Sequence, residues 1–324
     1  MDNLANIAIQ NGGSIYPLLI DSKNTNGTGL TNPSIFVYKN KFLVNLRHVE
    51  YTLYHSEKKK YCHPWGPLQY LHKENDLTLR TNNFLCYLDD SFNLSSYSKV
   101  DTSKLDVPPL WEFIGLEDAR IIEWDNKLYL SGVRRDTTTN GQGRMELSEI
   151  IEDNGVFKEI TRTRLPSPGA NDGYCEKNWM PIIDMPFHYV KWSNPTEIVK
   201  VSLDPVTCET VFMGQYQNYS YDFRGGSQVI PYKDGHISCA HRVNLYNSQV
   251  GRKDGKYEHL FLYWDKDWNM KWSNPFTFLN AEIEFCCGMT IQNDQAYITF
   301  GFQDNSAFLL QCPIDIIDKI LCLN

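Results

Sequence analysis

The repeated alternation of short apolar runs and tight-turn signals limits what this chain can fold into more than any other feature. Runs rich in Tyr, Phe, Val and Ile, broken by Asn, Asp and Gly, recur from Ile35 to Leu310. The first group of residues favours strands and the second favours turns. No long stretch shows the apolar spacing of an amphipathic helix. The sequence therefore predicts an all-β protein.

Tight hairpins are predicted within this pattern, because short polar pairs separate neighbouring strand-like runs. Four are expected, at residues 38–41, 124–127, 232–235 and 292–295. A further turn is expected at Asp265-Lys266-Asp267. An Asp-x-Asp pattern holds a metal and a nucleotide diphosphate in some transferases, but strand-like runs flank this one, which favours a hairpin.

Five small or polar clusters each precede an apolar strand, a tight turn and a second apolar strand. Their separations are in the range of four-stranded propeller blades that carry loops. We therefore predict a five-bladed β-propeller, in which the first strand of each blade lines the channel and the clusters meet at one end of the axis. The clusters are Asn32-Pro33-Ser34, Glu117-Asp118-Ala119-Arg120, Glu176-Lys177-Asn178-Trp179, Gly225-Gly226-Ser227 and Cys287-Gly288-Met289.

The chain shows no internal boundary. Its 324 residues, 42% of them apolar, suffice for a large core, and no linker or low-complexity segment divides them. We expect one domain over residues 1–324, with a rim insertion at about 53–79. A short helix is expected at about 313–321, since Pro313 suits a first helical turn.

The charge balance excludes several classes of partner. Lys and Arg number 31 and Asp and Glu 39, a net charge of −8, so neither nucleic acid nor an anionic membrane is an expected partner. No apolar stretch reaches the roughly 20 residues of a membrane span. The start, Met1-Asp2-Asn3, lacks a signal-peptide pattern, so a cytoplasmic location is expected.

Cysteine usage and motif content argue against a bound metal or cofactor. The nine cysteines include no Cys-x-x-Cys pattern and fit buried reduced thiols. Dinucleotide, nucleotide, zinc-protease and serine-hydrolase motifs do not occur in the sequence. No metal and no organic cofactor is therefore predicted.

The densest chemical cluster is Gly115-Leu116-Glu117-Asp118-Ala119-Arg120, which places two carboxylates and a guanidinium at the start of an apolar strand. Strand alternation predicts Asp118 and Arg120 on one side and Glu117 on the other. An ion pair between Asp118 and Arg120 is compatible with this arrangement.

This segment resembles a motif of glycoside hydrolase family 130, the β-mannoside phosphorylases with their related hydrolases and mannosyltransferases. In that family a Gly-x-Glu-Asp-x-Arg segment supplies the catalytic Asp, so the resemblance implies that Asp118 is catalytic. It also implies a five-bladed propeller and an acid that reaches the leaving oxygen through a sugar hydroxyl. Similar segments, in the same order, are Asn32-Pro33-Ser34, Arg134 or Arg135, Lys177-Asn178 and His241-Arg242.

Cations at strand ends fit a phosphorylase on chemical grounds. Inverting hydrolysis needs a carboxylic acid and a second carboxylate that activates water, whereas phosphate is already a charged nucleophile and needs cations to hold it. Neighbours in a strand point to opposite sides, so at most one of Arg134 and Arg135 is expected to bind phosphate directly. The predicted phosphate-binding residues are Arg134, Arg135, Lys177, His241 and Arg242.

The predicted sugar-binding residues come from the same clusters and strand ends. Trp179 is the candidate for stacking on a sugar face. Tyr257 and His259 could add a hydroxyl and an imidazole, or simply cap a blade. The full set is Asn32, Arg47, Glu117, Arg120, Asn178, Trp179, Ser227, Tyr257 and His259.

The sequence favours an inverting glycosyl-transfer enzyme that moves a sugar between an anionic phosphate or sugar-phosphate group and an acceptor. The Gly-rich Arg224-Gly225-Gly226 segment, which could admit a ligand closely, favours the alternative of a transferase that uses a nucleotide sugar. A hydrolase is a second alternative and needs another acid, for which Glu176, Asp222 and Glu284 are candidates. A non-catalytic glycan-binding propeller is a third. A homo-oligomer is compatible with each.

Overall fold

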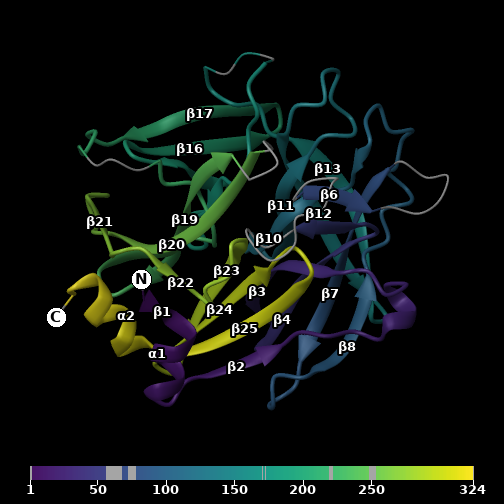
Figure 1. Cartoon of the computed structure of the whole chain (residues 1–324). Coiled ribbons are helices and arrows are strands. Elements are labelled where there is room, and N and C mark those ends of the chain that lie inside the picture. The colour runs from purple at the N-terminus through teal and green to yellow at the C-terminus, as the bar shows by residue number, and fades with distance from the viewer. Residues whose placement is uncertain are drawn as a thin grey trace.

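The computed structural model describes residues 2–55, 68–71, 78–169, 171, 173–218, 222–247 and 253–323. Strands make up 57% of the chain and helices 6%. Five sheets stand around a central axis (Figure 1). The predicted all-β, five-bladed propeller is confirmed.

The first three blades follow the order of the chain, the innermost strand first, and the separate pair β5 and β6 interrupts the first. The first blade contains β3 (Leu30–Tyr38), β4 (Lys41–Val49), β7 (Leu79–Leu88) and β8 (Leu94–Lys99). The second contains β10 (Glu117–Trp124), β11 (Lys127–Arg134), β12 (Arg144–Asp153) and β13 (Val156–Arg164). The third contains β14 (Met180–Pro181), β15 (His188–Ser193), β16 (Thr196–Leu203) and β17 (Val206–Met213).

The last two blades include strands from the start of the chain. The fourth contains β18 (Ile230–Tyr232), β19 (Gly235–Asn247), β20 (Lys253–Trp264), β21 (Met270–Trp272), β22 (Phe276–Thr277) and β1 (Asp2–Asn3). The fifth contains β23 (Glu284–Gln292), β24 (Gln295–Phe302), β25 (Ser306–Pro313) and β2 (Ser14–Pro17). The amino-terminal segment therefore completes both blades, which the sequence did not indicate.

The remaining elements lie outside this four-strand plan. They are β5 (Thr52–His55), β6 (Leu68–Leu71), β9 (Phe113–Ile114), α1 (Leu4–Gln10), the 3-10 turn η1 (Ser22–Asn24) and α2 (Ile314–Leu321). The sequence predicted a helix at the position of α2, and Pro313 directly precedes it. The strands β5 and β6 pair with each other inside the predicted rim insertion, of which residues 56–67 and 72–77 lie outside the described residues. No helix in the described ranges is long and apolar enough to cross a membrane.

The predicted hairpins are confirmed by their register. Tyr38 pairs with Lys41 and Trp124 with Lys127, and residues 232 and 235 and residues 292 and 295 pair in the same way. Asn40 and Asn126 have φ values of 59° and 61°, which is the left-handed conformation that two-residue hairpins require.

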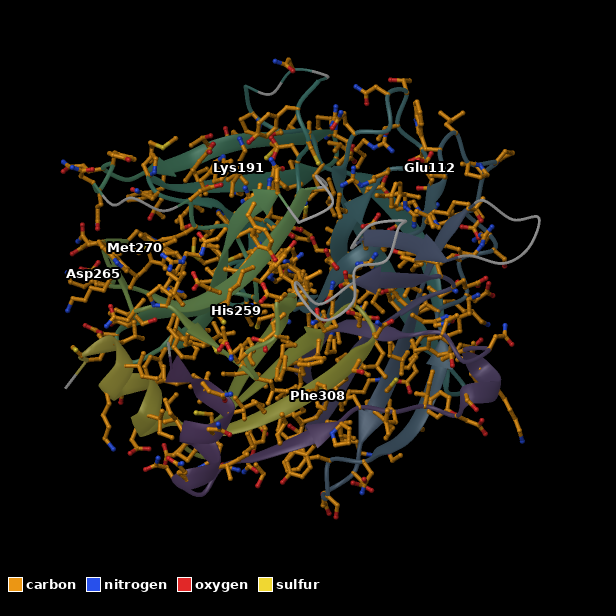
Figure 2. All side chains as sticks on the ribbon, in the orientation of Figure 1. Glu112, Lys191, His259, Asp265, Met270 and Phe308 are labelled. Atoms are coloured by element: carbon orange, nitrogen blue, oxygen red, sulfur yellow. The ribbon has the colours of Figure 1, made fainter. Side chains whose placement is uncertain are left out.

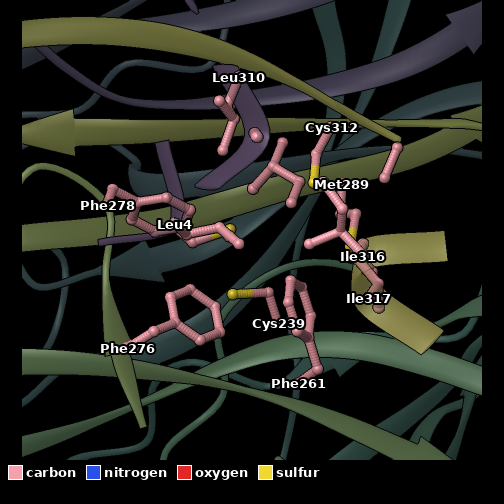
Figure 3. Packing of buried hydrophobic residues seen from close by; sticks show 14 of the residues in the cluster. Leu4, Cys239, Phe261, Phe276, Phe278, Met289, Leu310, Cys312, Ile316 and Ile317 are labelled. Atoms are coloured by element: carbon pink, nitrogen blue, oxygen red, sulfur yellow. The ribbon is translucent and has the colours of Figure 1, made fainter. Parts of the chain in front are cut away.

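Apolar cores between neighbouring blades close the ring. Each of five buried clusters joins two adjacent blades, and together they join the first to the second and so on around to the fifth and first. The cluster between the fourth and fifth blades also takes up both helices. Figure 3 shows Leu4 of α1 and Ile316 and Ile317 of α2 packed with Phe278 and Cys312.

Two polar side chains tie the inner strands together at the axis. The fully buried Gln228 amide donates to the carbonyl oxygens of Ile35 and Ile121 at 3.1 and 2.9 Å and accepts from the Met289 N–H. Arg120, also fully buried, donates to the carbonyl oxygens of Gly226 and Asp118 at 2.8 and 2.7 Å. These bonds fix the positions of the polar cluster at the start of each inner strand.

Candidate active site

Near the start of three inner strands, β3, β10 and β14, one residue has a left-handed backbone conformation. Asn32, Asp118 and Asn178 have φ values of 43°, 50° and 62°. Asn and Asp tolerate this conformation better than other non-glycine residues. In β3 and β10 the register with the second strand shifts at this point, which is the mark of a β-bulge.

The bulge overturns the predicted side-chain alternation in β10. Glu117 and Asp118 both reach Arg47, at 3.4 and 2.8 Å, instead of pointing to opposite sides. Arg120 bonds the backbone oxygen of Asp118. The acidic partner of Arg47 is therefore the Asp118 carboxylate, and the Asp118–Arg120 ion pair that alternation would allow does not form.

The Asp118 carboxylate is held by two donors at the end of the axis where Glu117, Lys177 and His241 also lie, a site called the pit below. Asn32 Nδ2 and Arg47 Nη1 both lie 2.8 Å from Asp118 Oδ1. Burial works to raise the pKa of Asp118, but the charges of Arg47 and Arg120 and the Asn32 hydrogen bond outweigh it and hold this pKa below its ordinary value. Asp118 is therefore ionised at neutral pH.

Arg47 is held in a fixed orientation. Its guanidinium also donates to the Thr81 hydroxyl and to Tyr51 Oη, each at 3.3 Å, and its side chain is 8% exposed. A planar guanidinium with this many hydrogen-bond partners fixes the orientation of the carboxylates around it.

Asp304 is an acidic residue of the site that the sequence analysis missed. It lies in the turn between β24 and β25, where the charges of Arg47, Asp118 and Glu117 act on it. Burial is the main cause that raises the pKa of Asp304, and likewise that of Glu117. The sequence did hold a signal for Asp304. It stands in the polar turn after the second strand of its blade, just as Arg135 follows β11.

In the predicted pairs Arg134–Arg135 and His241–Arg242, one residue lies near Glu117 or Lys177 and the other pairs with carboxylates inside its blade. Arg135 approaches Glu117 at 3.8 Å, whereas Arg134 is buried against Glu146 at 2.8 Å and Asp136 at 3.3 Å. Arg242 pairs with Glu258 inside the fourth blade. Carboxylates within the blades therefore pair with both guanidinium groups, and direct phosphate binding by Arg134 and Arg242 stays a prediction.

His241 faces the pit from β19. Its ring stacks on Tyr257 at 5.7 Å and meets the edge of Phe285 at 4.8 Å, and Nδ1 lies 3.0 Å from the Gly225 carbonyl oxygen. A carbonyl only accepts, so Nδ1 carries the proton. Burial is the main cause that holds the pKa of His241 well below its ordinary value, with further lowering by charges that include Lys177. The neutral ring therefore offers Nε2 as an acceptor.

Lys177 is the exposed cation of the site. Its charge acts on Glu117, Asp118 and His241, so its ammonium group lies within electrostatic reach of all three. It has no ion-pair partner within the described part of the chain. A cavity of about 210 Å³ beside it is lined by Tyr174, Trp192 and Arg224 among others.

The glycines before β18 serve packing. A Cβ at Gly225 would lie 1.8 Å from the Asn178 carbonyl oxygen, and one at Gly226 would lie 2.1 Å from that of Cys239. Protein backbone fills the space next to both residues. The expectation that these glycines admit a ligand is therefore wrong.

Several predicted sugar-binding residues are buried structural groups. Trp179 is 1% exposed and donates from Nε1 to Glu176 at 2.9 Å. Ser227 is fully buried and bonds Ser238. His259, inside the fourth blade in Figure 2, accepts from the Cys286 N–H, and burial lowers its pKa to about 3. Direct sugar contacts by these three, and by the fully buried Arg120, are ruled out. Asn32, Arg47, Glu117, Asn178 and Tyr257 remain around the pit.

Of the acids that the sequence analysis offered for a hydrolase, Glu284 is engaged by backbone, whereas Glu176 and Asp222 line the cavity beside Lys177. Glu284 accepts the backbone N–H groups of Phe278, Leu279 and Ala281. Glu176 bonds Trp179, and Asp222 pairs with Arg224 at 3.0 Å. The acids that surround Arg47 instead are Glu117, Asp118 and Asp304.

The described residues form no metal centre. Within the described ranges, no group of three or more His, Cys, Asp or Glu side chains could hold a metal ion. Asp265 accepts the backbone N–H groups of residues 267 and 269 in a turn at the edge of the molecule (Figure 2). The predicted turn is confirmed.

Comparison with solved structures identifies the architecture. The chain matches a β-1,2-mannobiose phosphorylase from Listeria innocua, in complex with β-1,2-mannobiose, with a TM-score of 0.57 and 14% identity over 96% of this chain and 100% of that one. The fold is that of the mannoside phosphorylases. A mannose phosphorylase from Leishmania mexicana, in complex with phosphate ion, matches with a TM-score of 0.52 and 11% identity over 97% and 93% of the two chains.

A glycosyl hydrolase from Bacteroides ovatus is also similar, with a TM-score of 0.54 and 12% identity over 88% and 84%. No family model and no curated protein matches the sequence. The family 130 resemblance read from the motifs is thus confirmed in the fold, and the similar structures are those of carbohydrate-processing enzymes. At identities this low the similarity shows the fold alone, so the function has to be argued from the residues of the site.

Proposed function

We propose that the protein is an inverting glycosyl-transfer enzyme of the mannoside phosphorylase type, which moves a sugar between phosphate and an acceptor hydroxyl. The observation that carries the proposal is the position of Asp118. One oxygen of this ionised carboxylate takes bonds from Asn32 and Arg47, while the charge of Lys177 acts on it from the anion side of the pit. Mannobiose and phosphate are the ligands described for the two phosphorylases of the same fold.

The lowered pKa of Asp118 suits the direction of synthesis. As the acceptor oxygen attacks the anomeric carbon of a sugar 1-phosphate, its proton passes to Asp118, either directly or through a sugar hydroxyl, and the bond to phosphate breaks. Inorganic phosphate leaves with the electron pair. In phosphorolysis a phosphate oxygen attacks the same carbon and Asp118 returns the proton to the leaving oxygen.

The anion side combines a mobile cation with a fixed acceptor. Lys177 is exposed and has the reach to close on a phosphate. In its neutral form, His241 Nε2 accepts a hydrogen bond from a protonated phosphate oxygen or a sugar hydroxyl. No metal or organic cofactor enters this scheme.

The test is phosphate release. The protein is incubated with mannose 1-phosphate and a panel of mannose, glucose and N-acetylglucosamine acceptors, with nucleotide sugars as a parallel set of donors. The expected result is phosphate release with at least one acceptor, lowered by about a hundredfold or more in Asp118→Asn. Thermal unfolding of both proteins verifies that the variant is folded. If native protein transfers no sugar from any donor, the proposal fails.

A second candidate is a hydrolase, which the acids around Arg47 favour. Glu117 and Asp304 have raised pKa values and lie near Asp118, so the site holds more than one carboxyl group. Two carboxyl groups are what inverting hydrolysis requires. Sugar release that does not depend on phosphate would favour this candidate over the phosphorylase.

A further inference from the structure

The segment that leads into β10 carries an indole ring held beside the turn that follows β11. Trp111 is 39% exposed, whereas Trp124, Trp179 and Trp264 are at most 1% exposed. Its Nε1–H donates to the Thr138 carbonyl oxygen at 2.7 Å. A backbone hydrogen bond also joins the two segments: the Leu110 N–H donates to the Asp136 carbonyl oxygen at 2.7 Å.

One face of this ring is covered by backbone. A Cβ built at Gly141 would lie 3.0, 3.2 and 3.3 Å from three neighbouring ring atoms of Trp111, Cδ2, Cε2 and Cε3. Nearly equal distances to three ring atoms mean that Gly141 lies over the ring face. Gly141 also has a φ of +70°, which favours glycine. The exposed surface of Trp111 is therefore held in a set orientation.

A series of contacts joins Trp111 to the acids around Arg47. Two residues further along, Phe113 lies 5.7 Å under the guanidinium of Arg135, and Arg135 approaches Glu117 at 3.8 Å. The turn that accepts the Trp111 N–H also begins at Arg135, because the Thr138 N–H and hydroxyl both donate to the Arg135 carbonyl oxygen, at 3.1 and 2.8 Å. The Arg135 side chain is 25% exposed, so donors remain open to a ligand between Trp111 and the pit.

We propose that Trp111 and Arg135 form a binding platform for an oligosaccharide acceptor, whose sugar units beyond the reacting one stack on Trp111 and bond Arg135. This inference rests on the proposed function for the identity of the sugar. A pyranose presents an apolar C–H face, which packs on an aromatic ring, and hydroxyl groups, which accept from a guanidinium. A protein partner is the less favoured occupant, because the ring is continuous with the acidic site.

Calorimetric titration with a β-linked mannotriose and with mannose tests the platform. We expect the trisaccharide to bind native protein about tenfold more tightly than mannose, and Trp111→Ala to remove that advantage while leaving mannose binding unchanged. Trp111→Phe restores part of it. The matched control is Trp272→Ala, because Trp272 is also 39% exposed but lies on β21 in the fourth blade.

Three results would overturn the inference. They are equal trisaccharide binding by Trp111→Ala and Trp272→Ala, an equal loss for both sugars in Trp111→Ala, and the absence of trisaccharide binding by native protein. Phosphate release from mannose 1-phosphate onto a monosaccharide is measured separately. That activity would stand without the platform, and binding of the trisaccharide would stand without the activity, so the two failures are distinct.

Discussion

Residues in the left-handed backbone region aim the polar tips of the inner strands at the pit. The sequence placed Asn32, Asp118 and Asn178 in the correct clusters because each cluster stands where an apolar strand begins. It could not give the side-chain directions. A bulge depends on register with the second strand, which is set by pairing and not by the local sequence. For the same reason alternation alone left Arg134 and Arg135 undecided.

Exchanging the two arginines for alanine separates structural from functional cations. Arg134→Ala leaves the buried Asp136 carboxylate without its cation and Glu146 with only the partly exposed Arg164, so we expect a loss of about 3 kcal/mol or more in the free energy of unfolding. Arg135→Ala removes a partly exposed side chain and should cost about 1 kcal/mol or less. Denaturant unfolding measures both values. Similar losses in the two variants would contradict the assignment.

The acid at position 304 should cost stability at neutral pH. A carboxyl group whose pKa is raised in the folded state disfavours folding once it ionises, and this cost appears as pH rises above its unfolded pKa. Asp304→Asn should therefore raise Tm at pH 7 by about 2 °C, a gain of the order of 1 kcal/mol. The gain should shrink toward pH 4. A variant that is less stable at pH 7 would show that the Arg47 charge outweighs burial at this site.

Among the elements, local signals were sufficient for hairpins and insufficient for strands at the start of the chain. Asn40 and Asn126 supply the positive φ that their turns need, so two residues specify each hairpin. β2 pairs with β25 across almost the whole sequence, and β1 pairs with β22 in the fourth blade. Four-residue and two-residue strands carry too little pattern to show such distant partners.

The short helix α1 should be energetically important because of what it buries. Leu4 is fully buried between the fourth and fifth blades, whereas Ile9 on the same helix is 48% exposed (Figure 3). Leu4→Ala should lower the free energy of unfolding by about 3 kcal/mol, and Ile9→Ala by less than about 1 kcal/mol. Chemical denaturation followed by fluorescence gives both. Equal effects would mean that the helix does not seal this interface.

For the whole molecule, the closed ring brings distant sequence clusters to one end of the axis. The five repeated units in the sequence were enough to predict the number of blades. They could not show that Gln228 spans the axis or that Asp304 joins the acids, since both depend on how the blades close on one another. Each apolar core holds two neighbouring blades together, and the hydrogen bonds at the axis join the inner strands.

Gln228→Ala tests the axial contact. Loss of the amide leaves the Ile35 and Ile121 carbonyl oxygens and the Met289 N–H buried without this partner. We expect a loss of the order of 3 kcal/mol in the free energy of unfolding. The exposed Gln10 offers the control, because Gln10→Ala should change stability by less than about 0.5 kcal/mol. A native-like Gln228→Ala variant would mean that the ring holds its shape without this residue.

Calorimetric titration with phosphate tests most directly whether cationic side chains bind an anion beside the Asp118 carboxylate. Native protein, Lys177→Ala and Lys266→Ala are titrated with inorganic phosphate; the Lys266 side chain is 75% exposed in the turn between β20 and β21. We predict that Lys177→Ala weakens binding by about tenfold or more and that Lys266→Ala binds like native protein. Native protein that takes up no phosphate, or a Lys177→Ala variant that binds it unchanged, would contradict the account.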